Sequence, residues 1–163
     1  MGSCSRLRTF LLYPPTRSMI DAIFVYGTLK RGQVRERCWP RAPVRVVAAV
    51  MRGELHDLGP YPALIPGDDR VLGELWFLRA EDVAESLRVL DEVECYGIDD
   101  VDLYVRRVVE CEELESSERH SAFVYHLANE NDARAHPRVP PRADGLVEWL
   151  PTDPRGREFD DDL

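Results

Sequence analysis

The sequence is poor in lysine: Lys30 is the only one among 163 residues, and every other strongly basic side chain is an arginine. The 21 Lys and Arg residues face 30 Asp and Glu residues, so the formal net charge at pH 7 is −9. No basic stripe offsets this excess of acid. Because nucleic acids and anionic membranes attract basic surfaces, we expect neither of them as a partner.

Closely spaced cysteines are also missing. The four cysteines, at positions 4, 38, 95 and 111, form no Cys-x-x-Cys motif, so the sequence indicates neither a zinc site nor a disulfide framework. The four histidines, at positions 56, 120, 126 and 136, have no metal-ligand spacing either. We therefore expect free thiols in a reducing cytoplasm and no metal centre.

Long hydrophobic runs are absent. A membrane-spanning helix needs roughly 20 apolar residues, and no stretch of this chain approaches that length. Residues 1–19 contain a short apolar run at 10–13 but no small-residue cleavage site, which argues against a secretory signal. We expect a disordered leader, or an upstream extension with the functional start at Met19. We expect one domain over residues 20–150 and an acidic tail over 151–163.

The most distinctive segment present is Phe24–Gln33, with the sequence FVYGTLKRGQ. Its β-branched and aromatic residues end at Gly27, which predicts a strand that leads into a tight loop. Glycine lets another group approach the main chain, so the amides of Gly27, Thr28 and Leu29 could converge on an anion or a developing oxyanion. An ordinary turn explains the same pattern. The spacing does not match the nucleotide-binding G-x-x-x-x-G-K-[ST] motif.

Four further runs rich in β-branched residues predict strands. They lie at 44–58, 71–78, 103–111 and 121–127. Gly53 interrupts the first of these runs and predicts a bulge or bend. Between the first two runs, the prolines beside Tyr61 and the turn residues 66–69 predict a stiff surface segment followed by a turn.

One principal helix is expected over residues 81–94, because acidic residues crowd its first turn and apolar residues recur at helical spacing. Helices do not alternate with strands, so a doubly wound parallel sheet is disfavoured. The pattern predicts an α+β fold: a small mixed β-barrel of about five strands, with this helix and short flanking helices.

Glu94 lies on an unexpected face of the predicted helix. At 100° per residue its apolar stripe also contains Val83, Leu87 and Leu90. Burying a carboxylate without a partner is costly, so such a group pairs with a cation or takes up a proton through a raised pKa.

Two interpretations of Glu94 stay open. In the structural one, the helix has already ended, or Glu94 pairs with Arg106 or Arg107. In the functional one, Glu94 is a general acid/base in a mostly apolar pocket. Strand alternation places Tyr104 and Arg106 on one face and Arg107 on the other, so the Tyr104 phenol could orient a substrate or Glu94 itself.

Together these motifs resemble the γ-glutamylcyclotransferase-like, or AIG2-like, family. The Tyr-Gly-Thr-Leu loop at 26–29 is followed by Glu94 and by Tyr104-x-Arg106. The segments GELHDLGPYPAL at 53–64 and GEL at 73–75 also match in the same order. The resemblance covers about residues 22–127 and, within the family, is greatest to the γ-glutamylamine cyclotransferase branch.

The resemblance implies a pocket between the glycine loop and the end of the helix, with Glu94 as the catalytic residue. The resemblance gives Tyr26, Gly27, Thr28 and Leu29 as substrate-binding residues. Strand alternation adds Tyr104 to this set. The implied reaction is attack by the α-amine of a γ-glutamyl group on its own γ-carbonyl, which gives 5-oxo-L-proline and a free amine. A small γ-glutamyl compound is thus the expected partner, and no cofactor is needed because the nucleophile belongs to the substrate.

Other functions remain possible at this point. A binding module of the same fold could hold a small acid without turnover, and a deacylase could remove a γ-glutamyl group from a biosynthetic intermediate with the same residues. A cysteine hydrolase would use Cys95 with His56 or His126, but a helix C-terminus disfavours a thiolate. Tyr61 and Pro62 are candidates for lining the amine half of a substrate.

Overall fold

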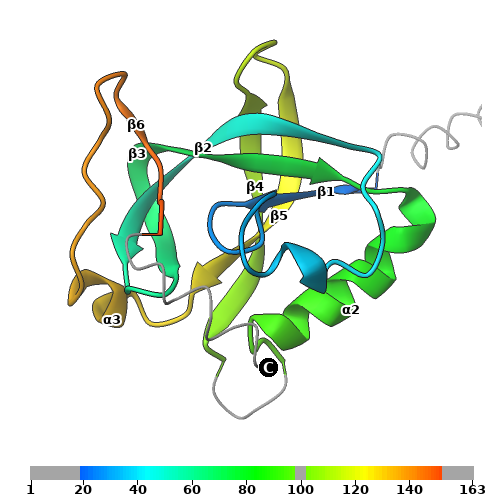
Figure 1. Ribbon diagram of the computed structural model, residues 1–163, viewed down its shortest axis with the longest axis horizontal. Coiled ribbons are helices and arrows are strands. Elements are labelled where there is room, and N and C mark those ends of the chain that lie inside the picture. The colour runs from blue at the N-terminus through cyan, green and yellow to red at the C-terminus, as the bar shows by residue number, and fades with distance from the viewer. Residues whose placement is uncertain (1–18, 98–101, 152–163) are drawn as a thin grey trace, which may run out of the picture.

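The computed structural model describes residues 19–97 and 102–151 (Figure 1). The predicted leader, apart from Met19, and the predicted tail, apart from Pro151, lie outside these residues. The strands form one sheet in the order β1-β5-β4-β2-β3-β6, and β1 also pairs with β3. This extra pairing closes five strands into a barrel. The barrel is mixed, because β1 runs parallel to β5 and antiparallel to β3.

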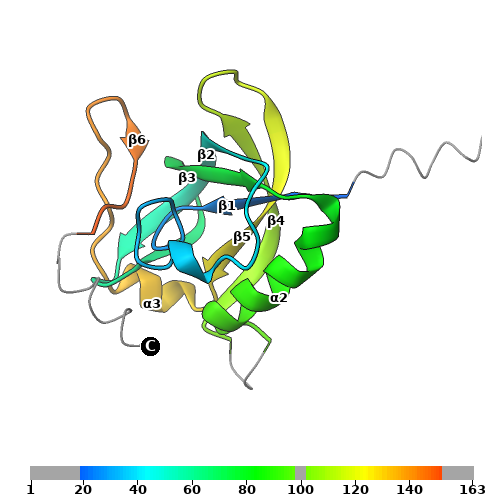
Figure 2. The same cartoon turned by 45° about the vertical axis from the view of Figure 1, so that its right-hand side comes forward.

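The bounds of β2, β4 and β5 agree closely with the predicted runs, whereas β3 begins earlier than its run. The strands are β1 (Ala22–Val25), β2 (Arg45–Asp57), β3 (Pro62–Phe77), β4 (Tyr104–Glu113), β5 (Arg119–Leu127) and the short β6 (Leu146–Val147). The helices are α2 (Val83–Val93), α3 (Glu130–Arg134) and the 3-10 turns η1 (Glu36–Cys38) and η2 (Ala80–Asp82). Both views place α2 and α3 below the barrel strands (Figures 1 and 2). The predicted α+β barrel with one main helix is therefore confirmed.

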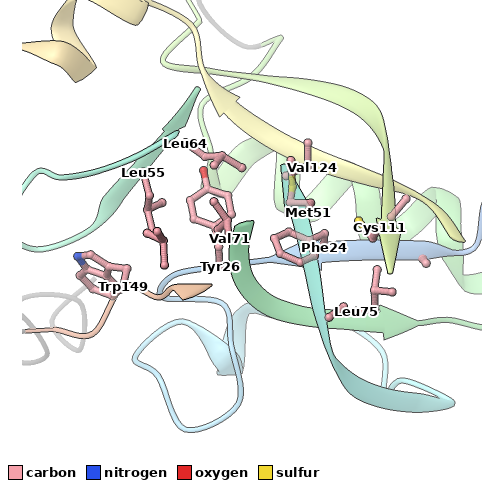
Figure 3. Packing of buried hydrophobic residues seen from close by; sticks show 14 residues of the cluster. Phe24, Tyr26, Met51, Leu55, Leu64, Val71, Leu75, Cys111, Val124 and Trp149 are labelled. Atoms are coloured by element: carbon pink, nitrogen blue, oxygen red, sulfur yellow. The ribbon is translucent and has the colours of Figure 1, made fainter. Parts of the chain in front are cut away.

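Alternation along the strands gives the barrel two buried faces. One set of side chains fills the interior, including Phe24, Met51, Leu75, Cys111 and Val124 (Figure 3). The alternate set faces outward and forms a second cluster, in which strand residues pack with Leu90 of α2. The helix is thus held against the barrel by its apolar stripe, and its C-terminal end is fixed beside the strands.

Strand β3 starts earlier than predicted. The prediction of a stiff surface segment is wrong from Pro62 onward, because Ala63, Leu64 and Ile65 are fully buried in the sheet. Instead of a turn, residues 66–68 form an extra stretch without partners on β2, where the register shifts between Gly53 and Glu54. The predicted bulge at Gly53 is confirmed. Pro62 and Pro66 are both tolerated in β3, since Pro62 begins the strand and Pro66 lies in the bulge.

Two smaller differences concern the helices. Helix α2 ends at Val93, one residue before the predicted end, and its first predicted turn is the 3-10 turn η2. Helix α3 lies where no specific element was predicted. It begins after Asn129, whose side chain accepts hydrogen bonds from the N–H groups of Asn131 and Asp132, an N-terminal cap that stabilises even a short helix. Within the part of the chain that the structure describes, no helix is both long and apolar enough to span a membrane.

Candidate active site

A pocket lies where the glycine loop, the start of β3, the end of α2 and the start of β4 meet. The space between protein atoms there, counting open solvent at its mouth, is about 380 Å³. Its lining residues are Phe24, Val25, Tyr26, Gly27, Thr28, Leu29, Arg35, Tyr61, Pro62, Glu94, Tyr104 and Tyr125. The structure therefore brings together all six residues predicted for the site, and it adds Tyr61 and Pro62, the two candidates for the amine half.

The glycine loop is fixed by contacts at both of its ends. The N–H of Lys30 donates to the carbonyl oxygen of Gly27 over 3.2 Å, which closes a tight turn. Lys30 itself is buried, with its Nζ 3.7 Å from Glu148 Oε2 and 3.4 Å from the carbonyl oxygen of Trp149. At Gly27 the chain passes so close to Pro62 that an added Cβ would lie 2.6 Å from the ring. Position 27 therefore requires glycine, because there is no room for a side chain.

Glu94 is the residue that ends α2. Its N–H donates to the carbonyl oxygen of Leu90 over 2.9 Å, and its backbone has already left the helical region. The helix has thus ended, as one interpretation held, yet the side chain still faces the pocket. Burial raises the pKa of Glu94 to about 7, and the charge of Arg35 opposes that rise. A carboxyl group with this pKa exchanges protons near neutral pH.

The alternative in which Glu94 pairs with Arg106 or Arg107 is wrong. Arg106 Nη1 lies 2.6 and 2.7 Å from the two carboxylate oxygens of Asp91, and the Tyr125 hydroxyl donates to the same carboxylate over 2.7 Å. Arg107 lies against His126 instead. Asp91, one helical turn before Glu94, is therefore the carboxylate that binds Arg106. This network connects α2 to β4 and β5, and Glu94 lines the pocket instead.

Tyr26 and Tyr104 of the pocket are neutral hydrogen-bonding groups. Burial raises the pKa of Tyr26 and of Tyr104 well above the usual range, and the charge of Glu94 adds to both shifts. Tyr104 donates to the carbonyl oxygen of Pro62 over 2.8 Å, and Tyr26 donates to that of Tyr125. Their protons are therefore engaged in holding the walls of the pocket, while each oxygen can still accept a hydrogen bond.

A model of γ-glutamyl cyclotransferases of the AIG2-like type matches residues 23–145. The chain belongs to this family. A relative from Niallia circulans, γ-L-glutamyl-butirosin B γ-glutamyl cyclotransferase, is 34% identical over 112 residues, which are 67% of this chain and 68% of the relative. The family predicted from the motifs is confirmed. The relative's name specifies a butirosin compound, so it does not support the narrower γ-glutamylamine branch.

Solved structures of similar proteins share the fold. An AIG2-like protein from Mus musculus superposes with a TM-score of 0.58 at 24% identity, over 83% of this chain and 99% of that one. A protein from Arabidopsis thaliana gives a TM-score of 0.54 at 26% identity, over 82% of this chain and 71% of that one. The five-stranded barrel with one main helix is thus the fold of these relatives.

The cysteine hydrolase gains no support from the geometry. Cys95, His56 and His126 are all outside the pocket lining. His56 is held between Glu54 Oε1, at 2.8 Å, and the carbonyl oxygen of His136, at 2.9 Å. Burial and the neighbouring Arg107 lower the pKa of His126 to about 4. Neither histidine is placed to activate a thiol in this pocket.

One group of potential metal ligands occurs among the described residues, and it lies on the β4–β5 hairpin. It consists of Glu113, Glu118 and His120, none of which lines the pocket. Glu113 already accepts two hydrogen bonds from the guanidinium of Arg45, at 2.9 and 3.3 Å. The arrangement is that of a surface ion-pair network.

Asp91 is the acidic neighbour that sequence reasoning passed over, and its substitution separates a structural carboxylate from a catalytic one. For Asp91→Asn we expect the free energy of unfolding to fall by roughly 1–2 kcal/mol, because the charge-assisted hydrogen bonds to Arg106 and Tyr125 are weakened. The loss is not larger because these side chains are partly exposed to water. Chemical denaturation measures this loss. Turnover should change only a few-fold, as in the exposed control Glu92→Gln. A loss of turnover as large as that of a Glu94 variant would contradict the structural role.

Proposed function

We propose that this chain converts the γ-glutamyl group of a small donor into 5-oxo-L-proline and releases the amine, with Glu94 as general acid/base. One observation carries the proposal: the carboxyl group of Glu94 has a pKa of about 7 in a pocket shared with the Tyr-Gly-Thr-Leu loop. Such a group can accept a proton and return it within one turnover at neutral pH.

Proton balance explains why one carboxyl group is enough. Overall, two protons leave the substrate α-ammonium and two arrive at the departing nitrogen. Glu94 takes the first proton, the freed amine attacks the γ-carbonyl, and a new C–N bond closes the five-membered ring. The carboxyl then protonates the leaving nitrogen as the old C–N bond breaks, and it transfers the second proton in the same way.

The glycine loop is assigned to the oxyanion. As the amine attacks, negative charge develops on the γ-carbonyl oxygen, and the backbone N–H groups of Gly27, Thr28 and Leu29 are proposed as its donors. The contacts that hold this loop at Lys30 and beside Pro62 support the amides as oxyanion donors, since donors that are fixed before the reaction need no reorganisation during it. Ring closure within one molecule also needs only a held, folded conformer of the substrate.

Two classes of amine half are candidates. The motif resemblance favours γ-glutamylamines, such as ε-(γ-glutamyl)lysine. The relative from Niallia circulans, named for γ-L-glutamyl-butirosin B, favours a γ-glutamylated biosynthetic intermediate as the second candidate. Both reactions use the same residues, and the free thiols of Cys95 and Cys111 suit the reducing cytoplasm expected for either.

The test is 5-oxoproline release from a panel of donors. The panel contains ε-(γ-glutamyl)lysine, γ-glutamyl dipeptides, glutathione and γ-L-glutamyl-butirosin B. Release from any of them supports cyclisation, and the best donor identifies the amine half. Binding without release, measured by calorimetry, would contradict the proposal and favour the non-catalytic binding module.

The pH dependence follows from the environment of Glu94. Below its pKa of about 7 the carboxyl group is protonated and cannot take a proton from the substrate. We therefore expect kcat/KM to rise about tenfold per pH unit up to about pH 7 and then to level off. Initial rates between pH 5 and 8.5 in overlapping buffers measure this profile. A midpoint near the ordinary value for glutamate would contradict a raised pKa of the Glu94 carboxyl group.

A further inference from the structure

Two charged side chains occur among the described residues that line the pocket, Glu94 and Arg35. Arg35 follows the glycine loop and directly precedes η1. Its N–H donates to the carbonyl oxygen of Thr28 over 2.9 Å, which folds this segment back onto the loop. Arg35 is close enough to act electrostatically on the pocket, since its charge opposes the rise in the pKa of both Glu94 and Tyr104.

The rest of the lining is aromatic, aliphatic or backbone. The hydroxyl protons of Tyr26 and Tyr104 are donated to main-chain oxygens, so they are not directed at a ligand. In such surroundings a buried carboxylate requires a cation or several strong donors. Arg35 is the one cationic side chain among the described residues of the lining.

A γ-glutamyl group carries an ammonium and a carboxylate on the same carbon atom. In the proposed function the ammonium must face Glu94, which leaves the carboxylate in need of a cation. We propose that Arg35 binds the α-carboxylate of the donor and thereby selects donors in which this carboxylate is free. This inference rests on the proposed function, and it leaves the loop amides free to serve the oxyanion.

The geometry of arginine suits this role. A guanidinium group can hold both oxygens of a carboxylate through two parallel hydrogen bonds. Two such bonds, with Glu94 on the neighbouring ammonium, fix rotation about the α-carbon. The amine is then held toward its own γ-carbonyl, so Arg35 contributes to positioning as well as to affinity.

The experiment combines enzyme variants with two donors that share one leaving amine. One donor has the free α-carboxylate and the other has an α-carboxamide in its place. The variants are Arg35→Gln, Arg35→Lys and the control Arg31→Gln, since the Arg31 side chain is 58% exposed and lies beside Glu74. Release of the amine is measured for every combination, and thermal melting verifies that each variant is folded.

We expect the wild type to prefer the carboxylate donor in kcat/KM by about 10- to 100-fold. In Arg35→Gln this preference should collapse to within a few-fold. Loss of the arginine charge lets the pKa of Glu94 rise further, which slows both donors alike and cancels in their ratio, and the carboxylate donor loses rate beyond that. Arg35→Lys should restore part of the preference, since it keeps the charge without the planar fork. Arg31→Gln should behave like the wild type.

Equal losses for both donors would overturn the inference, because Arg35 would then act through Glu94 or the fold. A shifted pH midpoint in Arg35→Gln with an intact donor preference would overturn it as well. Failure of the proposed function looks different: the wild type would release no 5-oxoproline from any donor. In that case calorimetry with the same two donors decides, since loss of the carboxylate preference in binding would still support the role of Arg35.

Discussion

Glu94→Gln is expected to lower kcat on the order of 10⁴-fold while the protein remains folded and still binds its donor. The amide has nearly the shape of the carboxyl group but cannot accept and return a proton. Single-turnover kinetics measures the loss, and calorimetry measures the retained binding. The matched control is Glu92→Gln, which removes an exposed carboxylate two residues away whose partner is Arg88. A Glu94 variant that keeps activity within tenfold of the wild type would refute the acid/base role.

The same variant also reports on burial through its stability. In the folded protein the pKa of Glu94 is about 7, above the ordinary value of 4.5. The folded state therefore prefers the protonated form, and the stability linked to it is fully present below pH 4.5 and lost as the pH rises through 7. Glutamine does not titrate. From acidic pH to pH 8, Glu94→Gln should gain up to about 3 kcal/mol of unfolding free energy relative to the wild type.

At Gly27, alanine is expected to lower kcat/KM by about 100-fold or more. Its Cβ would lie 2.6 and 2.7 Å from two ring carbons of Pro62. Pro62 cannot easily yield, because it begins β3 and its carbonyl oxygen accepts the Tyr104 hydroxyl at 2.8 Å. The loop must move instead, and a displacement of about 1 Å takes its amides away from the developing charge. Steady-state kinetics with the best donor measures the effect.

Gly32→Ala is the matched control for the loop. A Cβ there meets no atom within 4 Å, although the backbone φ of +81° makes any side chain strained. This variant should cost about 1 kcal/mol of stability and leave turnover within a few-fold of the wild type. If Gly27→Ala acts by collision, removing the ring in Gly27→Ala/Pro62→Ala should restore part of the activity. A fully active Gly27→Ala would mean that the loop has no part in catalysis.

The barrel is predictable because its strands are runs rich in β-branched residues that are separated by turn residues. Within β2, Gly53 marks the irregular point. Strand β3 was only half predicted, because its prolines are read locally as breakers. Whether a proline breaks a strand depends on whether its missing N–H would have had a partner, and the register with β2 decides that.

The site divides in the same way. Glu94 could be found because a carboxylate on an apolar stripe is anomalous within one helix. Asp91 and Arg106 could not be paired from the sequence, since their contact depends on how α2 lies across β4. Arg35 gave no local signal either, because it enters the pocket through the turn held by its hydrogen bond to Thr28. Tertiary contacts, rather than local patterns, decide which charged groups reach the pocket.

The buried lysine gives this molecule a chemical reporter at a single position. Lys30 is the chain's only lysine, and it is 6% exposed in the folded protein. Acylating reagents that target ε-amines therefore have one such target, and they reach it only when the glycine loop separates from Glu148 and Trp149. The acylation rate under native conditions thus measures how often the loop opens. If a bound donor slows acylation, the decrease in rate reports binding in the pocket without any turnover.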